Sequence, residues 1–178
     1  GCTTSATLVT SAIILPNGMM VYAHAAAAQN KIGVISSTGY VAAGDCKAGL
    51  AAPNAASFPT AMVYLAATKQ LLVSYASLTT AADNIYVYDI DETTGAISGA
   101  TKASQVGDEN VNIRGISAMH WDADESVLYV ANGSTTLANS IEKFTFNTTT
   151  KILTRVGSTP FSPNTVYHKC ITSMMVAK

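Results

Sequence analysis

Short hydrophobic runs separated by polar turns recur along this chain at a nearly constant spacing. Four of them begin with Ser or Thr and continue with mostly apolar residues, at positions 11–15, 60–64, 117–121 and 172–176. A recurrence at roughly 50 residues is a sign of repeated structural units. The chain is therefore expected to contain three full units and the beginning of a fourth.

Each of the first three units continues with three further runs in the same order. A polar turn leads into a second apolar run at 19–23, 71–75 and 127–131. A third run, preceded by Asn, follows at 32–35, 85–88 and 141–144, and a weaker fourth run lies at 40–43, 96–100 and 152–156. The runs are short, rich in β-branched and aromatic residues and bounded by turn residues, so they predict strands. No stretch has sustained helical periodicity.

Four antiparallel strands repeated at this length are typical of a β-propeller blade. A single four-stranded sheet exposes both faces to water, so each blade needs a neighbour that buries its apolar residues. We expect an all-β, propeller-like fold in one domain, 1–178, with four-stranded blades at about 11–45, 60–104 and 117–158. A partial fourth blade would combine residues 171–178 with residues 3–9.

Two segments resemble the repeats of lactonase-type propellers. Residues 84–97 (NIYVYDIDETTGAI) are similar to the repeat of that family, and residues 127–132 (VLYVAN) are similar to its second blade strand. The family includes 6-phosphogluconolactonase-like and muconate-lactonizing-like proteins, and the resemblance covers residues 11–176 as repeats. It implies a seven-bladed ring and lactone hydrolysis. The shared motifs are structural, so they specify the fold better than the function.

A seven-bladed ring of this repeat needs about twice the present length. Three explanations stay open: a fragment of a longer propeller, a compact domain of four blades of which one is reduced and closed by the termini, or strands exchanged between subunits. Open sheet edges recruit other chains, and a head-to-tail contact that does not close produces a filament. The expected partner is therefore another copy of the chain, as a homo-oligomer or polymer.

The composition of the chain limits the classes of function that we expect. Of the 178 residues, 48% are hydrophobic and only 12% are charged, and the formal net charge is −1. Without a basic cluster, binding to nucleic acid or to an anionic membrane surface is not expected. No apolar run reaches 18 residues, so no membrane span is expected either. A surface made of Ala, Ser and Thr favours a protein that is glycosylated, assembled, or both.

Cysteines and glycosylation sequons favour a secreted or extracellular protein. Cys2, Cys46 and Cys170 are the disulfide candidates, and an odd number leaves one thiol over if a single bridge forms. The bridge is either Cys2 to Cys170 or Cys46 to Cys170, the latter leaving Cys2 for a second chain, and three unpaired thiols are the remaining alternative. Asn132 and Asn147 begin Asn-x-Ser/Thr sequons and are candidates for N-glycans.

The candidate ligand-facing residues are His120, Asp122 and Arg114, because inner strands of a closed propeller line its channel. A packed or hydrogen-bonded His120 is the competing interpretation. The acidic turn at 122–125 lacks the Gly and the distant Glu of an EF-hand loop, and Asp also favours turns by bonding its own backbone. We therefore expect no metal ion at this turn.

Catalytic motifs are weak throughout the sequence. Lactone hydrolysis needs a general base and a cationic or metal stabiliser in one pocket, and neither arginine, Arg114 or Arg155, lies in a recognisable catalytic motif. No nucleophile elbow, phosphate loop or Cys-x-x-Cys pair occurs, and no cofactor is expected.

The sequence thus favours a secreted structural protein that self-assembles through its blades or through exchanged strands. A lactonase-like hydrolase, or a fragment of one, is the first alternative. A propeller module that binds a ligand or a protein is the second alternative.

Overall fold

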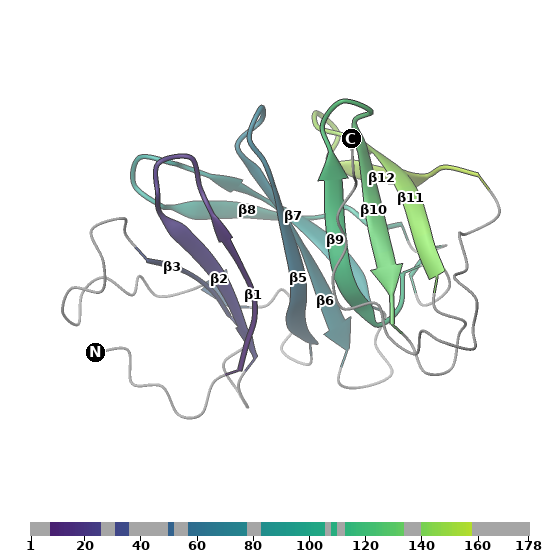
Figure 1. Ribbon diagram of the computed structural model, residues 1–178, viewed down its shortest axis with the longest axis horizontal. Helices are drawn as coiled ribbons and strands as arrows, with labels where there is room; N and C mark the ends of the chain where they lie inside the picture. Colours follow the sequence, from purple (N-terminus) through teal and green to yellow (C-terminus); the bar gives the residue numbers. More distant parts are fainter. Residues whose placement is uncertain are drawn as a thin grey trace.

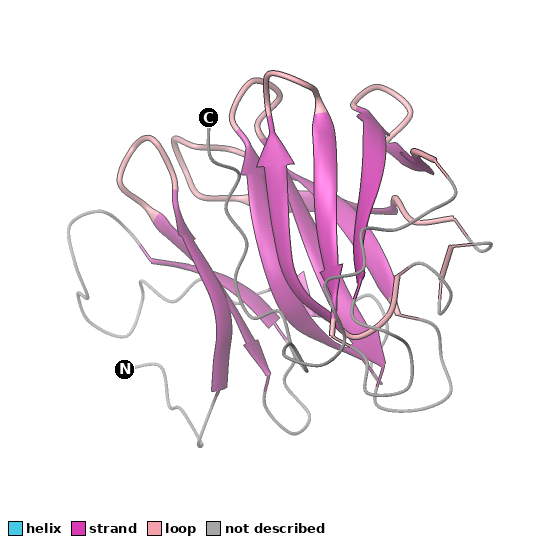
Figure 2. Cartoon of the chain, turned by 45° about the vertical axis from the view of Figure 1, so that its right-hand side comes forward, coloured by secondary structure: helices cyan, strands magenta, loops and turns pink. Residues whose placement is uncertain are grey.

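The computed structural model describes residues 8–25, 31–35, 50–51, 57–77, 83–105, 108–109, 113–133 and 140–157. In this part of the chain all regular structure is β-strand (Figure 2). The strands form three antiparallel sheets, which confirms the predicted all-β class.

Each sheet is a meander in which every strand pairs with the next one along the chain. The first sheet contains β1 (Leu8–Ile14), β2 (Met20–Ala25), β3 (Lys31–Ile35) and β4 (Leu50–Ala51). The second contains β5 (Ser57–Leu65), β6 (Gln70–Ser77), β7 (Asn84–Ile90) and β8 (Ile97–Lys102). The third contains β9 (Ile116–Asp122), β10 (Val127–Asn132), β11 (Ser140–Asn147) and β12 (Ile152–Arg155).

The three sheets follow one another across the molecule, with the second between the other two (Figure 1). Their first strands are neighbours, since β5 contacts both β1 and β9. Among the described residues the sheets do not close into a ring.

Both faces of the second sheet are buried, one against each neighbouring sheet. Successive side chains of a strand point to opposite faces of the sheet. Leu71, Val73 and Tyr88 therefore point towards the first sheet, and Leu72, Ile85 and Val87 point towards the third. The first group packs on residues of β2 and β3, and the second on residues of β9 to β12. The second sheet therefore has a neighbour on each face that buries its apolar residues.

The hairpin turns of the three units share one backbone feature. A residue at the end of each hairpin loop, one or two positions before the second strand, has a positive φ: 83° at Gly18, 53° at Lys69 and 54° at Ser126. A positive φ at the end of a short hairpin loop matches the twist of the strands it connects. Only the first unit uses glycine there, which explains why Pro16-Asn17-Gly18 is the clearest turn signal in the sequence.

The repeat read from the sequence is one residue out of register in the first unit. Residues 15–19 separate the paired residues Ile14 and Met20, whereas residues 65–70 separate Tyr64 and Leu71. The first hairpin is thus one residue shorter, and Ile14, not Leu15, is the structural equivalent of Tyr64. A shift of one residue exchanges the two faces of a strand, so the error changes which side chains are exposed.

The first unit also differs from its predicted bounds. Leu8 and Val9 belong to β1 and not to a separate terminal strand, and β4 lies after residue 45. The predicted strands at 40–43 and 171–178, and the remainder of 3–9, fall outside the described residues.

We predict that Leu72→Ala lowers the free energy of unfolding by about 3–5 kcal/mol, because it leaves a cavity between the second and third sheets. Leu72 is fully buried in that cluster. Urea denaturation monitored by circular dichroism measures the change. Ile152→Ala is the control, since Ile152 is 43% exposed and its loss should cost less than about 1 kcal/mol. Equal effects of the two substitutions would contradict the assigned core.

Candidate functional site

The three predicted ligand-facing residues do not form one site. His120 lies near the end of β9, half-buried and paired with Tyr129 of β10. Arg114 precedes the start of the same strand, and its backbone N–H donates to Asn132 Oδ1 at 3.0 Å. The four residue steps from Ile116 to His120 alone span about 13 Å of strand. Arg114 and His120 are therefore at opposite ends of β9.

Asp122 forms a turn with its own backbone. Its Oδ1 accepts hydrogen bonds from the N–H groups of Asp124 at 2.9 Å and Glu125 at 3.2 Å. This is the structural role that the sequence offered as the alternative to a cation loop. In the described part of the chain, no three His, Cys, Asp or Glu side chains gather closely enough to hold a metal ion.

The face of the third sheet that points away from the second carries polar side chains beside the buried apolar residues Ala118, Val127 and Ala131. Lys143 Nζ lies 2.7 Å from Glu125 Oε2 and 5.6 Å from the centre of the Tyr129 ring. The hydrogen bond with Glu125 raises the pKa of Lys143. His120 lies on the same face. The equivalent positions of the second sheet, by strand pairing, hold apolar residues: Val63, Leu72 and Val87.

The opposite face of the third sheet carries a buried polar network. Arg155 Nε and Nη2 both lie 2.8 Å from Glu142 Oε2, and Glu142 is almost fully buried. Next to them, Asn132 Nδ2 donates to Ser140 Oγ at 3.0 Å. These groups satisfy one another inside the sheet interface, so they hold the third sheet together and do not face solvent.

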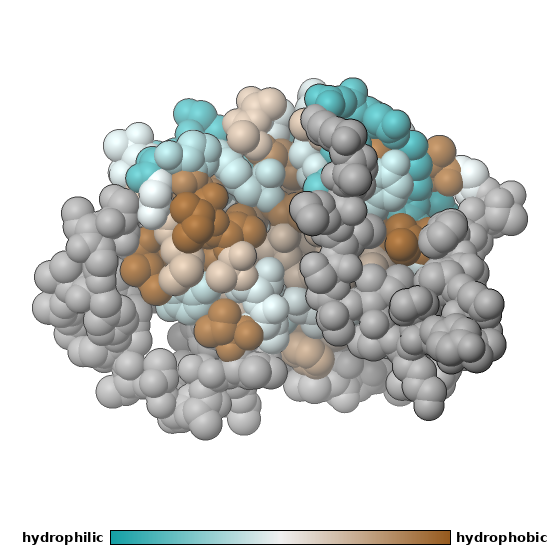
Figure 3. Space-filling model, in the orientation of Figure 1, coloured by the Kyte–Doolittle hydropathy of each residue, from teal (hydrophilic) through white to brown (hydrophobic). Residues whose placement is uncertain are grey.

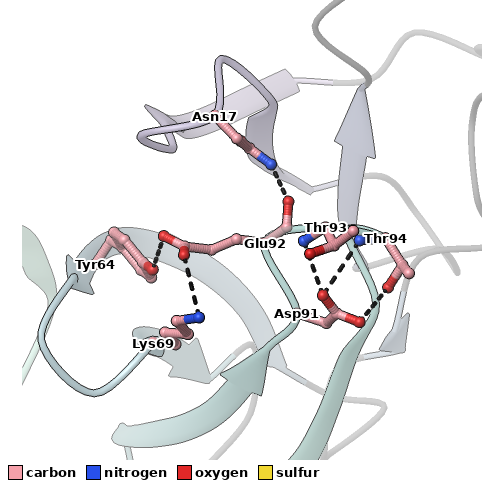
Figure 4. A network of polar contacts seen from close by, with 7 residues as sticks. All are labelled: Asn17, Tyr64, Lys69, Asp91, Glu92, Thr93 and Thr94. Atoms are coloured by element: carbon pink, nitrogen blue, oxygen red, sulfur yellow. Dashed lines mark hydrogen bonds and ion pairs between the residues drawn. The ribbon is translucent and has the colours of Figure 1, made fainter.

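A second polar cluster joins the turns of the first and second sheets (Figure 4). Glu92 accepts a hydrogen bond from Tyr64 Oη at 2.5 Å and lies 3.6 Å from Lys69 Nζ. Its backbone carbonyl accepts from Asn17 Nδ2 of the first hairpin. The cluster fixes the position of the first sheet on the second, and burial together with the Glu92 contact raises the pKa of Tyr64.

The Asp91 turn beside Glu92 is closed by its own side chain. Asp91 Oδ2 accepts from Thr94 Oγ1 at 2.8 Å, and its Oδ1 accepts from the backbone N–H of Thr93 at 2.8 Å. These hydrogen bonds lower the pKa of Asp91. A carboxylate held this way is a turn-forming group and not a general base.

Two tyrosine hydroxyl groups are paired inside the interface between the first and second sheets. The Oη atoms of Tyr75 and Tyr88 are 2.6 Å apart, and both side chains are buried. Burial raises the pKa of Tyr88 to about 12 and that of Tyr75 further. Both groups stay neutral at physiological pH.

Exposed apolar side chains lie on the face of the first sheet that points away from the second. We call it the outer face, and strand pairing places on it Val9, Ala12, Ile14, Met20, Tyr22, Gly33 and Ile35, together with the positions of His24 and Lys31. Ile14 is 66% exposed and Val9 is 56% exposed. Hydrophobic residues are visible at the surface over β1 and β2 (Figure 3).

Most outer-face residues have buried equivalents in the other two sheets. By strand pairing, Ile14 corresponds to Tyr64 and Trp121, and Met20 corresponds to Leu71 and Leu128. Tyr64 and Leu71 pack on the first sheet, and Trp121 and Leu128 pack on the second. The outer face is thus built like two sheet interfaces that the chain already forms.

The sequence interpretation missed this surface. It aligned residues 11–15 with 60–64, which paired Ile14 with Val63, whereas strand pairing makes Ile14 the equivalent of Tyr64. The shorter turn at 16–18 is the sequence signal that indicates this shift of one residue.

No family model and no curated protein matches the sequence. No helix in the described ranges is long and apolar enough to cross a membrane. The cysteines Cys2, Cys46 and Cys170 lie outside the described residues, as does His168.

The two sequons have different environments. Asn132 is 4% exposed, and both its amide nitrogen and its oxygen are hydrogen-bonded. Asn147 is exposed at the end of β11, where its Oδ1 accepts from the N–H groups of Thr149 and Thr150. A glycan is bulky and needs a surface position, so only Asn147 fits one.

We predict that secretion from a eukaryotic host gives one N-glycan per chain, at Asn147. Intact mass before and after glycosidase treatment measures it. Thr149→Ala should abolish the glycan and Ser134→Ala should leave it unchanged, and neither substitution alters the asparagine itself. A glycan that survives in Thr149→Ala and disappears in Ser134→Ala would contradict the assignment.

The tyrosine pair predicts a loss of stability at high pH. The folded-state pKa of Tyr88 is about 12 and its unfolded-state value is 10.0, so the unfolded chain releases the proton first. Stability is complete below pH 10 and falls as the pH rises towards 12, by about 2–3 kcal/mol from Tyr88 alone. Urea denaturation at pH 8, 10 and 11.5 measures it. The double variant Tyr75→Phe/Tyr88→Phe should lose less over this window, and an unchanged slope would refute the role of the pair.

Proposed function

We propose that this protein is a non-enzymatic structural scaffold that acts outside the cell and associates through its sheets. The observation that carries the proposal is the outer face of the first sheet. It exposes apolar residues at positions that the other two sheets bury against a neighbour. An exposed face of this composition is typical of an interaction surface.

A propeller-like arrangement is part of the proposal. Its support is the common packing of the sheets: the first strands lie side by side, and each sheet presents equivalent positions to the one before it. Repeat proteins of this kind gain stability from contacts between neighbouring units, so a sheet that lacks a neighbour on one face gains stability from binding one.

Burial of the outer face would contribute favourable free energy to association. Full burial of an exposed Val or Ile side chain contributes about 1.5–3 kcal/mol. Val9 and Ile14 are both more than half exposed, and Met20, Tyr22 and Ile35 are partly exposed beside them. Several such side chains together offset much of the entropy lost when two molecules associate.

Composition supports an extracellular scaffold. Only 12% of the residues are charged, so little like-charge repulsion keeps copies of the chain apart. The exposed sequon at Asn147 and the three cysteines fit a secreted protein.

The lactonase-like alternative gains no specific support from the described contacts. Its two proposed groups, His120 and Arg114, lie at opposite ends of β9. His120 is paired across the strands with Tyr129 and shares its face with the Lys143–Glu125 ion pair.

We predict concentration-dependent association of the full chain. Sedimentation velocity from about 1 to 200 μM, together with light scattering, measures it, and we expect the mean mass to increase at least twofold because the outer face becomes buried. Addition of reducing agent separates association through sheets, which persists, from disulfide linkage, which does not. A strict monomer over the whole range would refute the proposed function.

A further inference from the structure

The second sheet ends in an exposed edge strand. β8 is the last strand of that sheet, and no other described strand pairs with its free side. All of its residues after Ile97 are exposed. Such an edge presents unpaired backbone N–H and C=O groups, which another chain can use to add a strand. The one charged residue of β8, Lys102, is paired with Glu109 at 3.2 Å, so charge gives this edge little protection.

A β-bulge with glycine at its first position interrupts β8. Between the pairs Val87–Thr101 and Asp89–Ser98, β8 has two residues where β7 has one. Gly99 is the first of these two residues and has a φ of 70°. A bulge of this kind bends the strand and increases its local twist. The Gly99 carbonyl oxygen also accepts a hydrogen bond from Thr101 Oγ1 at 3.3 Å, so it already has a partner within the strand.

The bulge requires glycine for two reasons. A φ of 70° lies in the left-handed region, which a residue with a side chain adopts only at a cost in free energy. A Cβ atom at Gly99 would also lie 2.9 Å from Asp89 Oδ2. That oxygen lies 2.7 Å from Lys151 Nζ of the third sheet. Glycine therefore permits the bend and, at the same place, the ion pair between the second and third sheets.

The equivalent edge strand of the third sheet has no bulge, but the chain itself covers it. β12 pairs with β11 without a shift of register. On its free side, the Leu153 N–H donates to the Ala103 carbonyl oxygen at 2.9 Å, and the Leu153 carbonyl oxygen accepts from Gln105 Nε2 at 2.9 Å. The regular edge is thus occupied, whereas the edge without a described neighbour is bent.

We propose that the Gly99 bulge closes the free edge of the second sheet to strand addition by another copy of the chain. This inference goes beyond the proposed function, because it concerns an edge of a sheet and not a face, and it holds whether or not the outer face associates. The bend allows the chain to expose an edge strand of low charge without forming cross-β aggregates, in which strands of many copies pair edge to edge.

Deletion of Gly99 tests the inference. The deletion leaves one residue of β8 opposite one residue of β7, so it straightens the edge. We expect the full chain with this deletion to form thioflavin T-binding aggregates about tenfold faster than the wild type, or more, at a chain concentration of about 100 μM. Thioflavin T fluorescence over time measures the rate.

The matched control combines the deletion of Gly99 with Thr101→Lys. Thr101 is exposed, and the deletion leaves it opposite Val87, so the lysine lies on the straightened edge. A lysine on an edge strand opposes the addition of another strand. We therefore expect the control to aggregate as slowly as the wild type. Circular dichroism at low concentration checks that both deletion variants keep their β-structure.

Two results would overturn the inference. The first is a single-deletion variant that aggregates no faster than the wild type. The second is equal aggregation of both deletion variants, because aggregation would then follow from damage to the fold and not from the straightened edge. Neither result affects the proposed function, since association at the outer face is measured on the wild type by sedimentation velocity.

Discussion

The packing of the second sheet between its two neighbours is the constraint on which the rest of the structure depends. A four-stranded meander has two faces, and β6 places apolar side chains on both. Because both faces need cover, the first and third sheets must lie on either side of it. The Glu92 cluster and the Arg155–Glu142 pair then fix the sheets in place, but burial of apolar surface supplies the main stabilisation.

A change in hairpin length does not change which face of a sheet meets its neighbour. The second and third units have hairpins of equal length and present equivalent residues to the preceding sheet. The first hairpin is one residue shorter, yet β1 and β2 keep the same orientation, because Ile14 takes the position of Tyr64. The fold therefore conserves the direction of each side chain relative to the core and tolerates a change in turn length.

Much of the fold could be predicted from the spacing of apolar runs, because strands with buried faces leave a strong local pattern. The runs at 71–75, 85–88 and 127–131 each fall within a strand. The register of the first unit could not be read this way, since Ser11 to Leu15 fits the repeat equally well in two alignments. The burial of Asn132 could not be predicted from the sequence either. Its hydrogen-bond partners Arg114 and Ser140 are brought to it only by the pairing of β9, β10 and β11.

The candidate surface illustrates a general limit on reading function from repeats. A buried interface and an exposed docking face have the same composition, and only the presence of a neighbour distinguishes them. Ile14 and Trp121 occupy equivalent positions, but Trp121 packs edge-on against Phe146 while Ile14 faces solvent. On the third sheet, substitution of apolar positions by Lys143 and His120 marks an end of the stack. At the outer face of the first sheet, strand pairing places the positions of His24 and Lys31, so ionisable residues occur at both ends of the stack.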